Sequence, residues 1–287
     1  MEQAPFSAEQ PSPSWPPWFA FVAFLGALVC AVVAYGVIKA VAGVGPDEDS
    51  PPALTIVATL VQNVFLVVAA LVFARMVAPP RPWHFGLRRA PFWSTVGWAT
   101  LGMLAFYVLT AIYAALVDPA AEQEVTESLG VDDGTAGLIA AGLMVMVIAP
   151  FVEELFFRGF FYRALRTRYP LIVAALVDGV VFGFVHFSGA DGLLLLPPLA
   201  FLGVIFCLVY ERTGTLWAVI GMHAFNNAVA FTAQASDYDG WQVAVVLGPL
   251  MLVACALVPR LLPDGPAPLP PRPGGVGPHP QLSLPLE

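Results

Sequence analysis

Long uninterrupted apolar runs dominate this chain of 287 residues. A helix needs roughly 20 apolar residues to cross the hydrocarbon core of a bilayer, which is about 30 Å thick. Runs of about this kind lie at 19–43, 53–77, 92–117, 136–157, 171–187, 193–210, 215–233 and 241–262. A β-barrel is excluded because its strands alternate apolar and polar residues, whereas these runs are continuous. The expected fold is all-α, a polytopic transmembrane bundle of about eight helices, of which the fifth and sixth are short.

The composition excludes several classes of soluble protein. Hydrophobic residues make up 59 % of the chain and charged residues 11 %, against about a quarter charged in a typical globular domain. The net charge of −8 argues against a nucleic-acid partner. The three cysteines lie in apolar runs and are interpreted as small buried hydrophobes rather than as a disulfide framework. They are Cys30, Cys207 and Cys255.

Basic and acidic residues occupy alternate connections between the runs. Arginines gather at 75–89 and 158–168 and recur at Arg212 and Arg260, while acidic residues fill the opposite connections. By the positive-inside rule, both termini of a multi-pass protein of the cell (inner) membrane are expected in the cytoplasm. Lys39, near the outer end of the first run, is the exception, and its long stem can reach the interface.

The same patterns divide the chain into five parts. The first run is too long for a secretory signal and no basic segment precedes it, so a retained helix is expected. The parts are a Pro-rich N-terminal tail (1–18), three N-terminal transmembrane helices (19–117), a core (136–233), a last transmembrane helix (241–262) and a disordered Pro-rich tail (263–287). We find no internal repeat of the kind that marks many transporters.

A few ionisable or strongly polar residues lie inside the apolar runs. An intramembrane acid or histidine costs several kcal/mol, so each one is a functional hypothesis. These residues are Glu153, Glu154, Arg158, Asp178, His186, His223 and Asn227. His84, in contrast, lies in a polar loop and is expected to be exposed to solvent.

The two adjacent glutamates are expected to have different roles. Glu154 and Arg158 are four residues apart with the acid first, which is the favourable order for an ion pair on a helix. Glu153 is rotated by about 100° from Glu154, so it does not share that pair. We therefore expect a structural clamp from Glu154 and Arg158, and an unneutralised carboxylate from Glu153.

Two histidines complete the set. His186 lies four residues after Phe182, and Asn227 lies four residues after His223, so each pair shares a helix face. A single histidine in an apolar helix is more often a buried core residue. Two histidines on separate helices, an unpaired glutamate and an aligned asparagine together supply a base, proton carriers and a donor for an oxyanion.

Three motifs in this order resemble those of the CAAX-protease and bacteriocin-processing family of intramembrane proteases, which includes the type II CAAX prenyl endopeptidases. The motifs are Glu153-Glu154-x-x-x-Arg158, Phe182-x-x-x-His186 and His223-x-x-x-Asn227. The resemblance covers about 136–233 and implies hydrolysis of a peptide bond in a membrane-embedded or lipid-anchored peptide.

The resemblance implies that Glu153 and a histidine activate a water. The individual roles are our own hypothesis, in which Glu153 takes the proton and His186 holds the water. His223 and Asn227 would face the carbonyl. Glu154 and Arg158 would fix the helix that carries Glu153.

This mechanism makes a geometric demand. If the fifth span begins near Leu171, His186 lies roughly 24 Å along it, far from Glu153 at the inner end of the fourth span. We therefore expect the fourth span to continue as helix to about Arg166 and the fifth to enter the bilayer only near Asp178. The site would then lie in the cytoplasmic half of the membrane and face the cytoplasm. A separation of Glu153 and His186 above about 10 Å would exclude the mechanism.

Metal dependence and other functions stay open at this point. Glu153, His186 and His223 could hold zinc or another divalent ion, although no His-Glu-x-x-His helix is present, and a metal-free site is favoured. One alternative is a non-catalytic membrane scaffold or immunity-type protein that keeps the motifs as a packing network. A second is a proton-coupled transporter, in which Glu153, Asp178 and the histidines form a relay. A third is a purely structural metal site.

Overall fold

The computed structural model describes residues 13–117, 128–131, 133–187, 191–234 and 240–262. Within these ranges every regular element is a helix, and the predicted all-α class is confirmed. Residues 1–12 of the predicted N-terminal tail, the predicted C-terminal tail and most of the acidic connection after 117 lie outside the described residues, whereas α1 already begins at Pro17, within the predicted N-terminal tail. The main helices are α1 (Pro17–Ala42), α2 (Pro52–Arg75), α3 (Phe92–Val117), α5 (Gly134–Leu143), α6 (Ala149–Phe156), α7 (Arg163–Arg166), α8 (Leu171–Phe184), α9 (Leu196–Thr213), α10 (Leu216–Gln234) and α11 (Gly240–Leu257).

Six helical segments of the described chain are long and apolar enough to cross a membrane. They are Pro17–Ala42, Pro52–Arg75, Phe92–Val117, Gly134–Arg166, Leu193–Thr213 and Gly240–Leu261. The two remaining predicted spans are helical but fall outside this set. α8 has 14 residues, which is too few for a full crossing, and α10 has 19 and carries His223 and Asn227.

The fourth span is one helix of 33 residues, Gly134–Arg166. Two π-helical turns, Met144–Ile148 and Phe157–Tyr162, flank α6 within it. The first turn is closed by Ala149 N–H, which donates to Met144 O. The predicted continuation of this span to about Arg166 is therefore confirmed.

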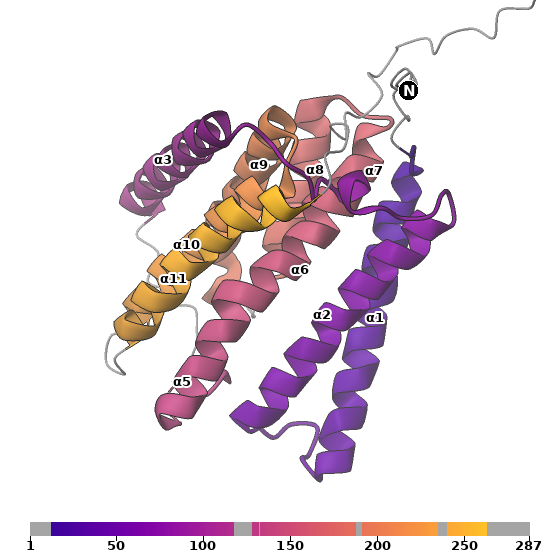
Figure 1. Ribbon diagram of the computed structural model, residues 1–287. Helices are drawn as coiled ribbons and strands as arrows, with labels where there is room; N and C mark the ends of the chain where they lie inside the picture. The colour runs from indigo at the N-terminus through magenta and orange to yellow at the C-terminus, as the bar shows by residue number, and fades with distance from the viewer. Residues whose placement is uncertain (1–12, 118–127, 132, 188–190, 235–239, 263–287) are drawn as a thin grey trace, which may run out of the picture.

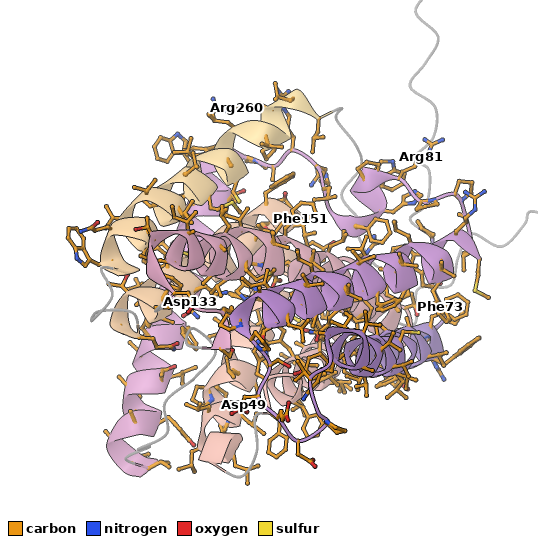
Figure 2. The ribbon with its side chains drawn as sticks, turned by 90° about the horizontal axis from the view of Figure 1, so that it is seen from below. Asp49, Phe73, Arg81, Asp133, Phe151 and Arg260 are labelled. Atoms are coloured by element: carbon orange, nitrogen blue, oxygen red, sulfur yellow. The ribbon has the colours of Figure 1, made fainter. Side chains whose placement is uncertain are left out.

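The helices form a bundle in which α6 has a central position (Figure 1). α1 packs on α2, α8 on α9, and α10 on α11, while α6 contacts both α2 and α10. Apolar side chains project from the outer faces of the bundle (Figure 2), and Val29 and Val32 on α1 are 61 % and 63 % exposed. An outer surface of this kind suits lipid rather than water.

Small residues allow the closest helix contact, between α8 and α9. A Cβ added to Gly203 would lie 2.7 Å from Gly179 Cα and 3.1 Å from Arg158 Nη2. A Cβ on Gly183 would lie 3.0 Å from backbone atoms of α9. No larger residue fits these positions without moving a helix, so the glycines bring α9 within reach of Arg158.

The connection between α2 and α3 is folded back onto the bundle. Tyr210 Oη donates to Phe85 O at 3.0 Å, and Leu216 N–H donates to Gly86 O at 2.8 Å. His84 is consequently 6 % exposed, so the expectation that it faces solvent is wrong. Burial, helped by the positive charges of Arg163 and Arg81, lowers the pKa of His84 to about 4.

Candidate active site

Glu153 lies between the two histidines predicted from the sequence. Its Oε2 atom is 3.9 Å from His223 Nε2 and 4.0 Å from His186 Nε2. The side chain is 19 % exposed, and Oε2 has no hydrogen-bond partner among the described residues. The separation is well inside the limit of about 10 Å that the mechanism requires. One water molecule could contact all three atoms across gaps of this size.

His186 lies two residues after Phe184, the last residue of α8, and its side chain is 28 % exposed. Its Nδ1 atom lies 2.9 Å from Phe182 O. A carbonyl oxygen only accepts, so Nδ1 carries the proton that is donated. In the neutral ring, Nε2 then has a lone pair directed toward Glu153. Helix α8 begins at Leu171, and where this helix enters the bilayer stays a prediction.

His223 lies on α10, with its side chain 4 % exposed. Its Nδ1 atom is 2.8 Å from Glu154 Oε1, so the ring is held by the glutamate next to Glu153. A carboxylate on one ring nitrogen fixes the orientation of an imidazole and leaves the other nitrogen for chemistry. This contact is not predictable from the sequence, because helix spacing relates Glu154 only to residues on its own helix.

Glu154 and Arg158 form the predicted ion pair, with Arg158 Nη1 2.9 Å from Glu154 Oε1. On its other side, Arg158 Nε lies 3.4 Å from Asp178 Oδ2. Both pairs have side chains that are 0 % exposed. Arg158 Nη2 also donates to Gly203 O at 3.1 Å. One arginine thus ties the fourth span to α8 and α9.

Aromatic rings enclose this charged cluster. The guanidinium carbon of Arg158 lies 4.3 Å from the centre of the Phe182 ring and 5.1 Å from that of Phe206. Cys207 Sγ donates to Asp178 Oδ2 at 3.2 Å. The rings attract the cation through their faces and exclude water from the ion pairs. Asp178 was singled out from the sequence, but its partnership with Arg158 was not.

Asn227 on α10 donates from Nδ2 to Val145 O at 2.8 Å. Val145 lies in the first π-helical turn, where each carbonyl accepts from the residue five positions later. The residue five after Val145 is Pro150, which has no N–H. Asn227 therefore satisfies a carbonyl that its own helix cannot. The role predicted for Asn227 at an oxyanion requires the second N–H of the same amide.

The three candidate ligands for a metal are farther apart than a bound ion requires. Ligand atoms about 2.0–2.1 Å from a tetrahedral zinc are about 3.3 Å from one another. Glu153 Oε2 is 3.9 and 4.0 Å from the two Nε2 atoms. Over the described part of the chain, no group of three His, Cys, Asp or Glu side chains is arranged to hold a metal ion.

Comparison with known proteins supports the predicted family. Residues 135–229 match the family model described as type II CAAX prenyl endopeptidase Rce1-like. This segment contains all three motifs, and the predicted resemblance is confirmed over it. No solved structure matches the chain.

Curated relatives come from two bacteria. The chain is 29 % identical over 122 residues to "Putative membrane peptidase YdiL" of Bacillus subtilis (strain 168), covering 39 % of this chain and 48 % of that protein. It is 34 % identical over 113 residues to the uncharacterized protein YyaK of the same bacterium, covering 36 % and 37 %. It is 29 % identical over 161 residues to an uncharacterized 24.3 kDa protein of Escherichia coli, covering 55 % and 71 %. The match thus spans about half or less of the first two relatives.

Proposed function

We propose that this chain is an intramembrane endopeptidase that hydrolyses a peptide bond of a membrane-associated peptide or protein. The observation that carries the proposal is the position of Glu153 Oε2, 3.9 and 4.0 Å from two histidine Nε2 atoms that come from separate helices. This atom is buried and has no hydrogen-bond partner in the described chain, and an internal water is the partner that we propose for it. The match of residues 135–229 to a protease family supports the same conclusion.

The first step is activation of the water. Glu153 takes one proton from it, while His186 Nε2 accepts a hydrogen bond from the other. His186 is suited to accept because its Nδ1 proton is donated to Phe182 O. The hydroxide then adds to the carbonyl carbon of the substrate. A positioned base of this kind contributes about 10²–10⁴-fold to the rate.

The second step is collapse of the tetrahedral intermediate. Its oxyanion accepts from the Asn227 N–H that is not donated to Val145, with His223 beside it. Glu153 returns its proton to the amide nitrogen as the carbon–nitrogen bond breaks. Glu154 and Arg158 do not touch the substrate in this scheme. Glu154 orients His223, and Arg158 holds Glu154 in place.

The sidedness of the proposed site follows from the arginines. Arg75 ends α2 and Arg260 follows α11, while Asp49 precedes α2 and Asp133 precedes α5. By the positive-inside rule the arginine end faces the cytoplasm, together with both termini. We propose that the substrate reaches Glu153 from this side, in the cell (inner) membrane.

Cleavage by the purified full chain in proteoliposomes tests the proposal. The probes are a farnesylated peptide with a C-terminal CAAX sequence and the same peptide carrying an acyl anchor instead. The Glu153→Gln variant is expected to lose about 10²–10⁴-fold in rate while it elutes and unfolds as wild type does. Glu48→Gln, in the exposed connection before α2, is the matched control and is expected to cleave normally.

The same assay separates the alternatives. Loss of cleavage on treatment with a chelator, and recovery with added zinc, would assign Glu153, His186 and His223 to a metal. Full cleavage by Glu153→Gln would overturn the proposed base. If no probe is cut and the variant keeps the cellular phenotype of wild type, the scaffold function replaces this proposal.

A further inference from the structure

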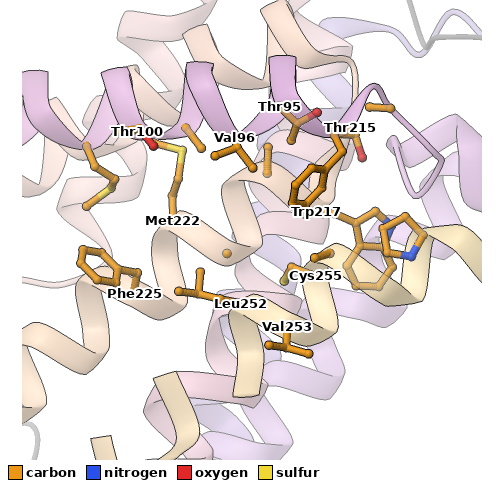
Figure 3. A pocket seen from close by; sticks show the side chains of 18 of the residues that line it. Thr95, Val96, Thr100, Thr215, Trp217, Met222, Phe225, Leu252, Val253 and Cys255 are labelled. Carbon is orange, nitrogen blue, oxygen red and sulfur yellow. The ribbon is translucent and has the colours of Figure 1, made fainter. Parts of the chain in front are cut away.

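An apolar groove lies on the opposite side of α10 from Glu153. Residues of α3, α10 and α11 line it, and its volume is about 960 Å³. Figure 3 shows side chains from the three helices converging on this space, among them Val96, Met222 and Leu252. None of the four proposed catalytic side chains is among its lining residues. The groove is therefore a separate feature from the candidate active site.

The walls of the groove belong to the outer surface of the bundle. α3 packs on α9 and α11 packs on α10, so the space between them has α10 as its floor. Leu104 on α3 is 59 % exposed, and Val253 on α11 is 52 % exposed. Both helices are long and apolar enough to cross a membrane, so the groove opens toward lipid chains rather than water.

Two arginines stand at one end of the groove. Arg89 and Arg260 belong to its lining, and both side chains are exposed. Arg89 Nη2 donates to Arg260 O at 2.8 Å, which joins the start of α3 to the end of α11. The Arg260 guanidinium lies 5.8 Å from the centre of the Phe92 ring. In a chain of net charge −8, this places two positive charges beside the mouth of an apolar channel.

The dimensions fit a lipid chain better than a helix of another protein. From Phe92 to Tyr107, the lining of α3 runs about 22 Å, somewhat more than the roughly 15 Å depth of one leaflet. A helix about 10 Å wide would need roughly 1,700 Å³ over that length. The groove has about half this volume, so it cannot enclose a helix of a second copy of the chain, whereas a single acyl chain is narrow enough to lie along it.

Trp217 lies near the charged end. Its indole lines the groove, and its Nε1 atom is buried without a hydrogen-bond partner among the described residues. Tryptophan is enriched where a membrane protein meets lipid headgroups, because its ring is apolar and its N–H is polar. The position of this ring thus indicates that the charged end of the groove lies near the depth of the headgroups.

We propose that this groove binds an anionic phospholipid, with one acyl chain between α3 and α11 and the phosphate against Arg260 and Arg89. The site is independent of the peptidase activity proposed above. The arginines at one end of the groove attract the phosphate, and the apolar side chains along the rest of the groove bury the acyl chain. A basic residue near a membrane surface favours an anionic lipid by about fivefold, so two of them give at least that preference.

Quenching of Trp217 by brominated lipids tests the proposal. The full chain is placed in phosphatidylcholine nanodiscs, and either phosphatidylglycerol or phosphatidylcholine with brominated acyl chains is titrated in. The Trp217 signal is the difference between wild type and Trp217→Phe. Phosphatidylglycerol is expected to reach half-maximal quenching at a mole fraction about fivefold lower than phosphatidylcholine does.

Two pairs of variants locate the bound lipid. Arg260→Glu is expected to abolish the preference for phosphatidylglycerol. Arg75 is also exposed but does not line the groove, so Arg75→Glu is expected to keep this preference. Thr100→Trp fills the groove and is expected to reduce quenching by both lipids. Leu101→Trp, a lipid-facing neighbour outside the lining, is expected to leave it unchanged. Signals from the added tryptophans are subtracted with the corresponding Trp217→Phe double variants.

Three results would overturn the proposal. Equal quenching by the two lipids would mean that any acyl chain enters the groove and the arginines select nothing. An equal loss of the preference for phosphatidylglycerol in Arg260→Glu and Arg75→Glu would mean that the general surface charge, rather than the groove, causes this preference. Absence of quenching by either lipid would mean that Trp217 is closed off, by its own bundle or by another protein.

Discussion

Glu153 and Glu154 are neighbours on one helix, yet they differ in burial and in the partners that hold them. Glu154 is fully buried and contacts Arg158 and His223. Glu153 is 19 % exposed, and its Oε2 atom lies 3.9 Å or more from the nearest histidine nitrogens. A rotation of about 100° per residue is enough to direct one carboxylate toward Arg158 and the other toward the space between the two histidines. Glu154 Oε1 binds two charged or polar partners, whereas no hydrogen bond holds Glu153 Oε2 among the described residues.

This difference indicates how a membrane protein can keep charge inside its bundle. Charges buried in a low dielectric are tolerated when they are paired and hydrogen-bonded. In the cluster of Glu154, Arg158 and Asp178, the charges are paired through two ion pairs, and a carbonyl and aromatic rings also contact Arg158. We infer that the cluster provides a rigid frame and that Glu153 is the side chain left for chemistry.

The most damaging change should be the loss of the arginine that holds the enclosed cluster. Arg158→Ala leaves Glu154 and Asp178 buried without their shared partner. Removal of one member of a buried pair costs about 3–5 kcal/mol, so unfolding in detergent should occur at a much lower temperature or denaturant concentration. Arg75→Ala, an exposed arginine at the end of α2, is the control and should change stability little. A midpoint equal to that of wild type in Arg158→Ala would contradict the framework role.

The two glutamates give a matched pair for the next test. Glu154→Gln removes the charge that faces Arg158 and His223, and should lower the free energy of unfolding by about 2–3 kcal/mol. Glu153→Gln should change it by less than about 0.5 kcal/mol, because the side chain has no protein hydrogen bond to lose at Oε2. Chemical denaturation of both variants measures the difference. Equal effects on stability would show that the two acids do not divide their roles as described.

A smaller effect is expected where the frame depends on close backbone contact. In Gly203→Ala, the new methyl group meets Gly179 Cα and the guanidinium of Arg158. Overpacking of this kind typically costs about 1–3 kcal/mol. Gly97→Ala on α3, where an added Cβ meets nothing within 4 Å, is the control and should be neutral or slightly stabilising. Cleavage should fall in Gly203→Ala together with stability, unlike in Glu153→Gln.

His84 allows pH effects on folding to be separated from those on the site. Its pKa falls from an ordinary 6.5 to about 4 in the folded chain, because burial favours the neutral ring. The stability that it contributes is present above pH 6.5 and is lost as the pH falls from 6.5 through about 4. A loss of about 2 kcal/mol near pH 5 is expected from these two pKa values.

The variant that isolates this contribution is His84→Asn. It keeps an acceptor for Arg81 N–H, which His84 Nδ1 now accepts at 3.2 Å, but it does not titrate in this range. The midpoint temperature of thermal unfolding should therefore fall less between pH 7 and pH 4 in the variant than in wild type. An unchanged slope would mean that other groups carry the acid sensitivity.

The helices were predictable because hydropathy alone determines where a chain can cross a bilayer. The predicted runs 53–77 and 92–117 agree with α2 and α3 to within two residues at each end. The pair Glu154–Arg158 was also predictable, since helix geometry relates residues four apart. The extension of the fourth span to Arg166 was predictable from the proposed mechanism, because Glu153 and His186 must lie at a similar depth in the membrane.

Contacts between helices could not be predicted in the same way. The bond from His223 to Glu154 joins residues 69 apart, and that from Asn227 to Val145 joins residues 82 apart. Nothing in local spacing encodes such distances. His84 shows the reverse error, because a polar neighbourhood in the sequence suggested exposure while Tyr210 and Leu216 tie its loop to the bundle. Burial of a loop depends on what folds over it.

The two π-helical turns rotate α6 about the helix axis relative to the helical segments before and after it. Each turn acts as a one-residue insertion, so the eight residues of α6 are out of step with the helix on both sides. Deleting one residue from Met144–Ile148 would restore an ordinary helix there and turn Glu153 by about 100° relative to α5. The orientation of the carboxylate is therefore set by residue count rather than by residue type. Insertions and deletions in this helix should be tolerated far less than substitutions.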